Sequence, residues 1–135
     1  KIANGRRSKI INLKAVVTLI VQEISKEGER RRYFELPLER NQIQFFPLTW
    51  TIVHPINENS PFSKYDLSSS DLHFELMILL EGFDETFAQT VHSMTSYRKQ
   101  EFVAGARFTK SFVQNEHHTI LNLDEISEFE KVDYP

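Results

Sequence analysis

Residues 11–21 read INLKAVVTLIV, and every odd position of this stretch carries an apolar side chain. Successive side chains of a β-strand point to opposite faces, so this alternation predicts a strand with one buried face. A polar turn with Gly28 follows, and the alternation resumes in residues 31–38. We therefore predict a β-hairpin with a loop longer than two residues, and Pro37 indicates that its second strand lies at a sheet edge.

Further strands are predicted where the alternation recurs between turn-rich segments, namely at residues 48–54, 73–80, 87–94, 107–113 and 119–123. About seven short strands of this kind predict an all-β fold, specifically an immunoglobulin-like antiparallel β-sandwich. Only residues 124–129 suggest a helix, with Asp124 as its N-cap. No internal repeat or domain boundary interrupts the pattern, so residues 1–135 are expected to form a single domain.

The composition is that of a folded protein without disulfides. The chain has 135 residues with 11 phenylalanines, 4 glycines and 5 prolines, which is enough apolar material for one core and argues against disorder. The absence of cysteine excludes a disulfide framework or a thiolate metal site and favours a reducing compartment. The net charge of −3 indicates no partner, although residues 1–14 are basic and residues 124–133 are mostly acidic.

The chain lacks the signals of a membrane-spanning or exported segment. No apolar run approaches the roughly 18 residues that a membrane-spanning helix needs, so this segment is expected to be soluble. Because the chain begins at Lys1 without a methionine or a signal-peptide pattern, we expect it to be a segment of a longer protein. The main activity would then depend on parts of the protein outside this sequence.

No motif for catalysis or metal binding stands out. None of the histidines has a metal-ligand spacing such as H-E-x-x-H, so surface or structural roles are expected for His54, His73, His92, His117 and His118. There is no G-x-S-x-G motif and the glycines are isolated, which argues against a serine hydrolase and against a phosphate-binding loop. We therefore expect no enzyme activity, no catalytic residue, no metal site and no cofactor.

Two charged clusters have simple structural interpretations. Glu81, Asp84 and Glu85 lie around Gly82, and although an acid–base pair can be imagined there, a charged turn between two strands is the preferred interpretation. The arginines of residues 30–32 alternate between faces, which favours a solvated sheet edge over a nucleic-acid-binding stripe. No nucleic-acid partner is expected.

Longer stretches resemble the cytoplasmic domain of prokaryotic-type inward-rectifier potassium channels. In residues 51–61, TIVHPINENSP, a strand and a histidine precede an amide-rich turn that closes on Ser-Pro, as in that family. The likeness continues through residues 71–82, where an aspartate-led strand ends in Leu-Glu-Gly, and through residues 85–97. Residues 3–8, ANGRRS, are similar to the A-N-x-R segment that begins the family's domain after the membrane, and Trp50 is more typical of prokaryotic members.

The resemblance implies a β-sandwich that assembles as a homotetramer around a four-fold axis and extends the path of potassium ions. Glu101 falls where the family has a pore-facing acid, and Asn12 falls where strongly rectifying relatives carry a glutamate. A ring of carboxylates raises the local cation concentration and attracts cationic blockers such as magnesium and polyamines. Because Asn12 is neutral, one acidic ring would be missing and strong polyamine block is not expected.

The resemblance also implies a gating loop and a lipid-binding segment. The loop that narrows the pore at its membrane end would comprise Gly105, Ala106, Arg107 and Phe108, and Ala104 replaces the family's tryptophan. The basic positions beneath the membrane would be Arg6, Arg7 and Lys9, in contact with anionic lipid headgroups. Each basic residue near such a surface contributes on the order of 1 kcal/mol.

Two functions follow as hypotheses from these observations. The first is a pore-extending and gating domain on the cytoplasmic side of the cell membrane, as part of an integral membrane protein. The second is a free-standing β-sandwich module that binds a protein or a ligand through its loops. Sequence upstream of Lys1 with or without membrane-spanning helices distinguishes them.

Overall fold

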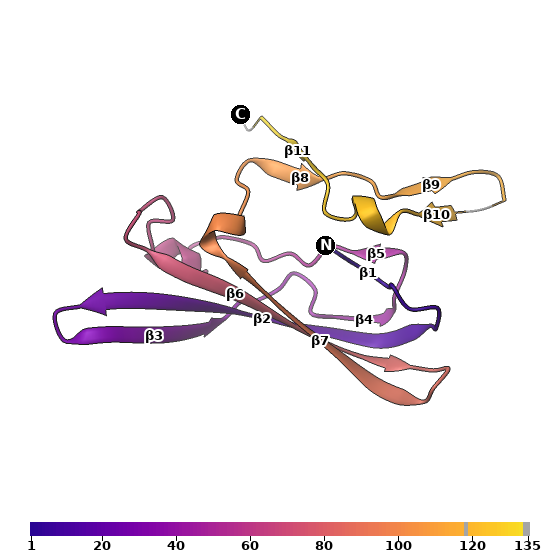
Figure 1. Ribbon diagram of the computed structural model, residues 1–135, viewed down its shortest axis with the longest axis horizontal. Helices are drawn as coiled ribbons and strands as arrows, with labels where there is room; N and C mark the ends of the chain where they lie inside the picture. Colours follow the sequence, from indigo (N-terminus) through magenta and orange to yellow (C-terminus); the bar gives the residue numbers. More distant parts are fainter. Residues whose placement is uncertain (118, 134–135) are drawn as a thin grey trace.

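The structure, a computed structural model, describes residues 1–117 and 119–133 and is built almost entirely from antiparallel strands. A five-stranded sheet forms one layer, and the smaller two-stranded sheets lie together on one side of it (Figure 1). This arrangement confirms the predicted all-β antiparallel sandwich. Among the described residues, no helix is long and apolar enough to span a membrane.

The large sheet is organised around one long strand. Its strand order is β3-β2-β6-β7, and β4 pairs with the first half of β2. The strands are β2 (Ile10–Ser25), β3 (Gly28–Glu35), β4 (Gln42–Phe45), β6 (His73–Asp84) and β7 (Gln89–Arg98). Strands predicted at residues 11–21, 73–80 and 87–94 are therefore present, but β2 and β6 are longer than predicted and β7 begins two residues later and ends four residues later.

The first hairpin differs from its prediction in loop length. Ser25 pairs with Gly28, so the loop contains only Lys26 and Glu27 and the prediction of a longer loop was wrong. The charged residues 29–32 stay in the ladder because β3 lies at the edge of the sheet, where charged side chains reach water. Their exposure confirms the interpretation of the arginine run as a solvated edge.

The inner face of β2 carries the core. Its side chains from Leu13 to Val21 are buried at every second position, in the order that the sequence predicts. Val17, Leu19 and Val21 pack with Leu36, Phe62 and Phe74 in one cluster. Ala15 and Leu13 pack with Ile10 and Trp50 in a second cluster. Burial of a core side chain of this size stabilises the fold by about 1.5–3 kcal/mol.

A β-bulge changes the phase of β2 near its start. Ile11 pairs with Phe83 and Lys14 pairs with Glu81, so Asn12 and Leu13 both lie opposite Gly82. Asn12 takes a φ of 50°, in the left-handed region that asparagine tolerates better than most residues. In consequence Ile10 and Leu13 are both buried although they are three residues apart, and they close around Gly82.

The second layer consists of short strand pairs. These pairs are β1 (Ile2–Ala3) with β5 (Thr49–Trp50), β8 (Ala106–Phe108) with β11 (Phe129–Lys131), and β9 (Phe112–Gln114) with β10 (Thr119–Leu121). The described residues also contain three short 3-10 helices: η1 (Pro61–Lys64), η2 (Lys99–Glu101) and η3 (Leu123–Glu125).

Several predicted boundaries in this layer were wrong. The strand predicted at residues 107–113 is two strands, because β8 and β9 pair with different partners. Of residues 48–54 only Thr49–Trp50 join a ladder, and the strand predicted at residues 119–123 ends at Leu121. The helix predicted at residues 124–129 is a single 3-10 turn capped by Asn122, whose side chain accepts the Asp124 N–H, followed by β11.

Candidate functional site

Asp84 forms a buried ionic centre with the chain's N-terminal segment. Its Oδ2 accepts hydrogen bonds from Ser8 Oγ at 2.5 Å and from Arg6 Nε at 3.1 Å, and Arg6 Nη2 also lies 3.1 Å away. Its Oδ1 accepts the backbone N–H groups of Thr86 and Phe87 at 3.0 and 3.2 Å. The hydrogen bond from Ser8, followed by the two backbone donors and the Arg6 guanidinium, lowers the pKa of Asp84 despite its burial.

The basic residues predicted to bind lipid have unequal surroundings. The Arg6 side chain is 46% exposed and paired with Asp84, whose side chain is 0% exposed. Arg7 and Lys9 are exposed, and within the described residues neither side chain forms an ion pair. The backbone carbonyl of Lys9 accepts the N–H of Glu85 at 3.3 Å, which holds the segment against the β6–β7 turn. The segment that carries the three basic residues thus lies beside the β6–β7 turn, at one end of the large sheet.

Sequence reasoning missed Asp84 as a partner of this segment. The charged-turn interpretation fits Glu85, which is exposed, but Asp84 is the buried last residue of β6. The signal was present in the sequence, because the inward positions of β6 recur at even numbers and Asp84 continues them. A carboxylate on an inward face needs a hydrogen-bonding or ionic partner.

The predicted gating residues surround the start of β8. Gly105 has a φ of +63°, a left-handed conformation that favours glycine, and its carbonyl accepts the N–H of Val132 at 2.8 Å. Ala106, Arg107 and Phe108 form β8 itself, and Arg107 Nε lies 2.6 Å from Glu130 Oε1 on β11. The loop is therefore a glycine turn followed by a strand that β11 holds in place.

The N-terminal segment reaches this strand. Lys1 Nζ donates a hydrogen bond to the carbonyl of Thr109 at 2.6 Å and lies 5.9 Å from the centre of the Phe108 ring. Ile2 and Ala3 pair with Trp50 and Thr49 between that contact and Asp84. One segment therefore touches both the basic, predicted lipid-binding end and the predicted gating strand.

Glu101 is exposed at the end of β7, in η2. Its Oε2 accepts the N–H of Arg98 at 2.7 Å, and the next residue, Phe102, packs edge-on against Phe74 with 5.0 Å between ring centres. These contacts fix the short helix while leaving the carboxylate in solvent.

Asn12 is also exposed, but it lies at the other end of β6. It faces Gly82, whereas Arg98 pairs with Glu75, seven residues along that strand and about 23 Å away. The structure therefore does not bring Asn12 and Glu101 together.

His54 forms hydrogen bonds that connect two loops next to the core. His54 Nδ1 lies 2.6 Å from the carbonyl of Pro37, and its Nε2 lies 2.6 Å from Ser60 Oγ. Because a carbonyl only accepts, Nδ1 carries the hydrogen, and buried Ser60 also accepts the N–H of Phe62. Residues 54–61 of the family-like stretch thus form a hydrogen-bonded turn next to the core.

A further histidine contact lies on the surface of the large sheet. His92 Nε2 lies 3.1 Å from Glu81 Oε2 as an exposed cross-strand pair. No group of three or more potential ligands occurs within residues 1–117 and 119–133. The predicted role of His118 lies outside the described residues.

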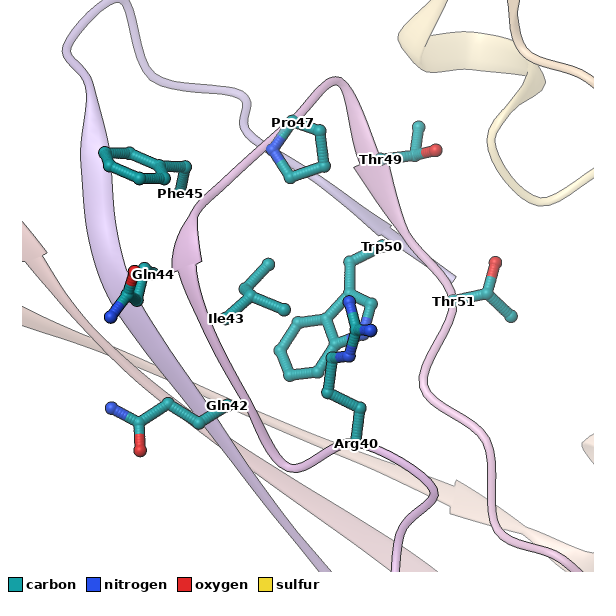
Figure 2. A pocket seen from close by; sticks show the side chains of 9 residues that line it. All are labelled: Arg40, Gln42, Ile43, Gln44, Phe45, Pro47, Thr49, Trp50 and Thr51. Atoms are coloured by element: carbon teal, nitrogen blue, oxygen red, sulfur yellow. The ribbon is translucent and has the colours of Figure 1, made fainter.

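An open pocket of about 440 Å³ lies between β4 and β5. Figure 2 shows Ile43 and Trp50 in its middle, with Phe45 and Pro47 towards one rim. Arg40 is its only charged residue, and the lining contains no carboxylate and no histidine. The pocket therefore offers no acid–base pair.

Together these features define a β-sandwich domain that presents a docked basic segment, an exposed acid and a glycine-led loop. The family model of the inward rectifier potassium channel C-terminal domain matches residues 1–135, and the chain belongs to this family. The predicted family is therefore confirmed, and it is a family of ion-channel domains rather than of enzymes.

Similar proteins come from bacteria and from animals. The chain is 36% identical over 114 residues to the inward rectifier potassium channel Kirbac3.1 of Paramagnetospirillum magnetotacticum, covering 83% of this chain and 39% of that protein. It is 33% identical over 121 residues to ATP-sensitive inward rectifier potassium channel 12 of Gallus gallus, covering 80% and 27%. It is 30% identical over 114 residues to channel 10 of that type in Rattus norvegicus, covering 81% and 30%. The chain thus spans well under half the length of these relatives.

Proposed function

We propose that this chain is the pore-extending and gating domain of an inward-rectifier potassium channel on the cytoplasmic side of the cell membrane. Four copies surround the ion path, Glu101 lines it, and the segment with Arg6, Arg7 and Lys9 responds to anionic lipid. The observation that carries the proposal is the family match over residues 1–135. It favours this function over a free-standing binding module.

The exposure of Glu101 supports its role in the pore. Four carboxylates at one level attract cations, and at physiological salt their fields extend over about 8 Å. Potassium would be concentrated there, and magnesium or polyamines would be held as blockers. At the level of Asn12 no charge is added, so block by polyvalent cations is weak to moderate.

The test of the pore role is Glu101→Gln in the full-length channel. We expect weaker block by magnesium and spermine, with Glu58→Gln, an exposed glutamate on the turn before η1, as the matched control. Because the chain has no cysteine, Glu101→Cys also places a single thiol in this domain. Crosslinking between subunits at that thiol is expected, and its absence together with unchanged block would refute the pore position.

The lipid role is tested with Arg6→Ala plus Arg7→Ala in reconstituted channels. Removing two charges at about 1 kcal/mol each is expected to shift the dose response to anionic lipid by roughly tenfold or more. An unchanged dose response contradicts the role. The direction of the lipid effect on channel opening is read from the same experiment.

A further inference from the structure

Arg6 has two potential partners, one inside the domain and one outside it. Its guanidinium is already paired with the Asp84 carboxylate, although nearly half of its side chain is in solvent. Both Arg6 contacts go to the same oxygen, Oδ2, rather than to the two oxygens of a bidentate pair. A phosphate group offers more oxygens in a geometry that suits a guanidinium.

Asp84 remains satisfied when Arg6 leaves. Ser8 Oγ still donates to Oδ2, and the N–H groups of Thr86 and Phe87 still donate to Oδ1. Since Asp84 is fully buried, an incoming anion reaches Arg6 without contacting the carboxylate directly. After the exchange, both the Asp84 carboxylate and the Arg6 guanidinium therefore still have hydrogen-bonding partners.

Ser8 and Lys9 keep their own hydrogen bonds to Asp84 and Glu85, so Arg6 matters for the residues before them, 1–6, which we call the strap. The Arg6 N–H donates to Asn4 Oδ1 at 3.0 Å, and Asn4 Nδ2 donates to the Ser8 carbonyl at 2.9 Å. Closer to the N-terminus, β1 has only two residues paired with β5, and Lys1 contacts Thr109 at the end of β8. A pairing this short has little stability of its own, so the Asp84 contact contributes to holding it.

We propose that a phosphate-bearing anion displaces the Asp84 carboxylate from Arg6 and thereby loosens the strap against β5 and β8. Asp84 is then the internal competitor of the anion, and Arg6 is a positioning residue as well as an anion ligand. The inference rests on the proposed function and adds how the anion signal reaches the gating strand.

The first experiment measures binding of this chain to vesicles of phosphatidylcholine and phosphatidylglycerol in equal amounts. Asp84→Asn frees Arg6, so binding is expected to tighten by about threefold or more. Glu85→Gln is the matched control, because it removes the same charge from an exposed neighbour that makes no ion pair with Arg6. If Asp84→Asn binds no more tightly than Glu85→Gln, the exchange is wrong.

The second experiment uses Trp50, the single tryptophan, which pairs with Ile2 in the strap and is 8% exposed. Loosening the strap is expected to shift its emission to longer wavelength. Arg6→Gln should give this shift without any anion, whereas Arg7→Gln, with the same charge change and no contact to Asp84, should not. This comparison does not depend on the folding of an Asp84 variant.

The two sources of phosphate are separated by the probe. A Trp50 shift with inorganic pyrophosphate and with the vesicles assigns the exchange to the phosphate group itself, and a shift with vesicles alone assigns it to a membrane surface. No shift with either overturns the loosening of the strap. If Arg6→Gln and Arg7→Gln both bind vesicles as the unmodified chain does, the lipid role fails as well. If they bind more weakly while Asp84→Asn equals its control, only the exchange fails.

Discussion

Replacing Gly82 by alanine tests the bulge that sets the phase of β2. An added Cβ would lie 2.6 Å from Ile10 Cγ2 and 3.2 Å from Leu13 Cδ1, whereas carbon atoms pack at about 3.5–4.0 Å. Ile10 must therefore move by about 1 Å, and its β-branched side chain has little rotamer freedom. Both side chains are buried, at 4% and 5% exposure, so solvent offers no room.

Gly82→Ala is expected to lower the stability of the domain. Overpacking of this kind costs about 1–3 kcal/mol, and removing a strand glycine returns about 0.5–1 kcal/mol. The free energy of unfolding should fall by about 1–2 kcal/mol, which lowers Tm by about 4–8 °C in a domain of this size. Urea unfolding and thermal unfolding followed by circular dichroism measure the two quantities. Gly5→Ala is the matched control, because nothing lies within 4 Å of a Cβ added there.

A double-mutant cycle identifies the clash. Ile10→Ala removes the Cγ2 atom, so Gly82→Ala should cost at least about 1 kcal/mol less in that background. Ile10→Val keeps Cγ2 and should give no relief. The reasoning is refuted if Gly82→Ala is neutral in the unmodified chain, or if its cost is the same with and without Ile10 Cγ2.

Two further predictions concern buried polar groups. The pKa of the Asp84 carboxyl is lower in the folded state than in the unfolded state. The ionised carboxylate therefore contributes stability at pH values above the usual carboxyl pKa of about 3.9, and this contribution is lost as pH falls through the lower folded pKa. Thermal unfolding between neutral pH and pH of about 2 should therefore show a smaller acid-induced loss of Tm for Asp84→Asn than for Glu85→Gln, and equal losses count against the assignment. His54→Ala leaves Ser60 and the Pro37 carbonyl without their partner, which should cost about 1–3 kcal/mol in urea unfolding, and a cost near zero contradicts the assigned hydrogen bonds.

The sequence alone was sufficient for the fold class and for the strands of the large sheet. Alternation over residues 11–21 identifies β2 because one face of that strand is buried along most of its length. It fails in the second layer, where the pairs have two or three residues and depend on distant partners rather than on local pattern. The break between β8 and β9 has no local signal in the alternation.

The family resemblance selected the candidate site residues, whose roles stay predictions, but it did not predict their contacts. The resemblance pointed to the basic segment and the glycine loop, and the structure shows Gly105 in a left-handed backbone conformation that favours glycine. It did not indicate that Arg6 is paired with Asp84, 78 positions away in the chain, or that Lys1 contacts Thr109. Both contacts depend on the course of the strap from the end of β6 past β5 to Thr109, which no short-range pattern encodes.

The left-handed backbone at Asn12 limits how an acidic ring could be added to the proposed tetramer. The direct change is Asn12→Glu, which would add four carboxylates to the proposed tetramer. At a φ of 50° the Cβ of most residues lies too close to the following carbonyl oxygen, which costs roughly 1–2 kcal/mol, and glutamate lacks the short polar side chain that makes asparagine an exception. Charge at this position is therefore coupled to the stability of the bulge, and a variant library should recover aspartate here more readily than glutamate, because aspartate tolerates left-handed backbone better.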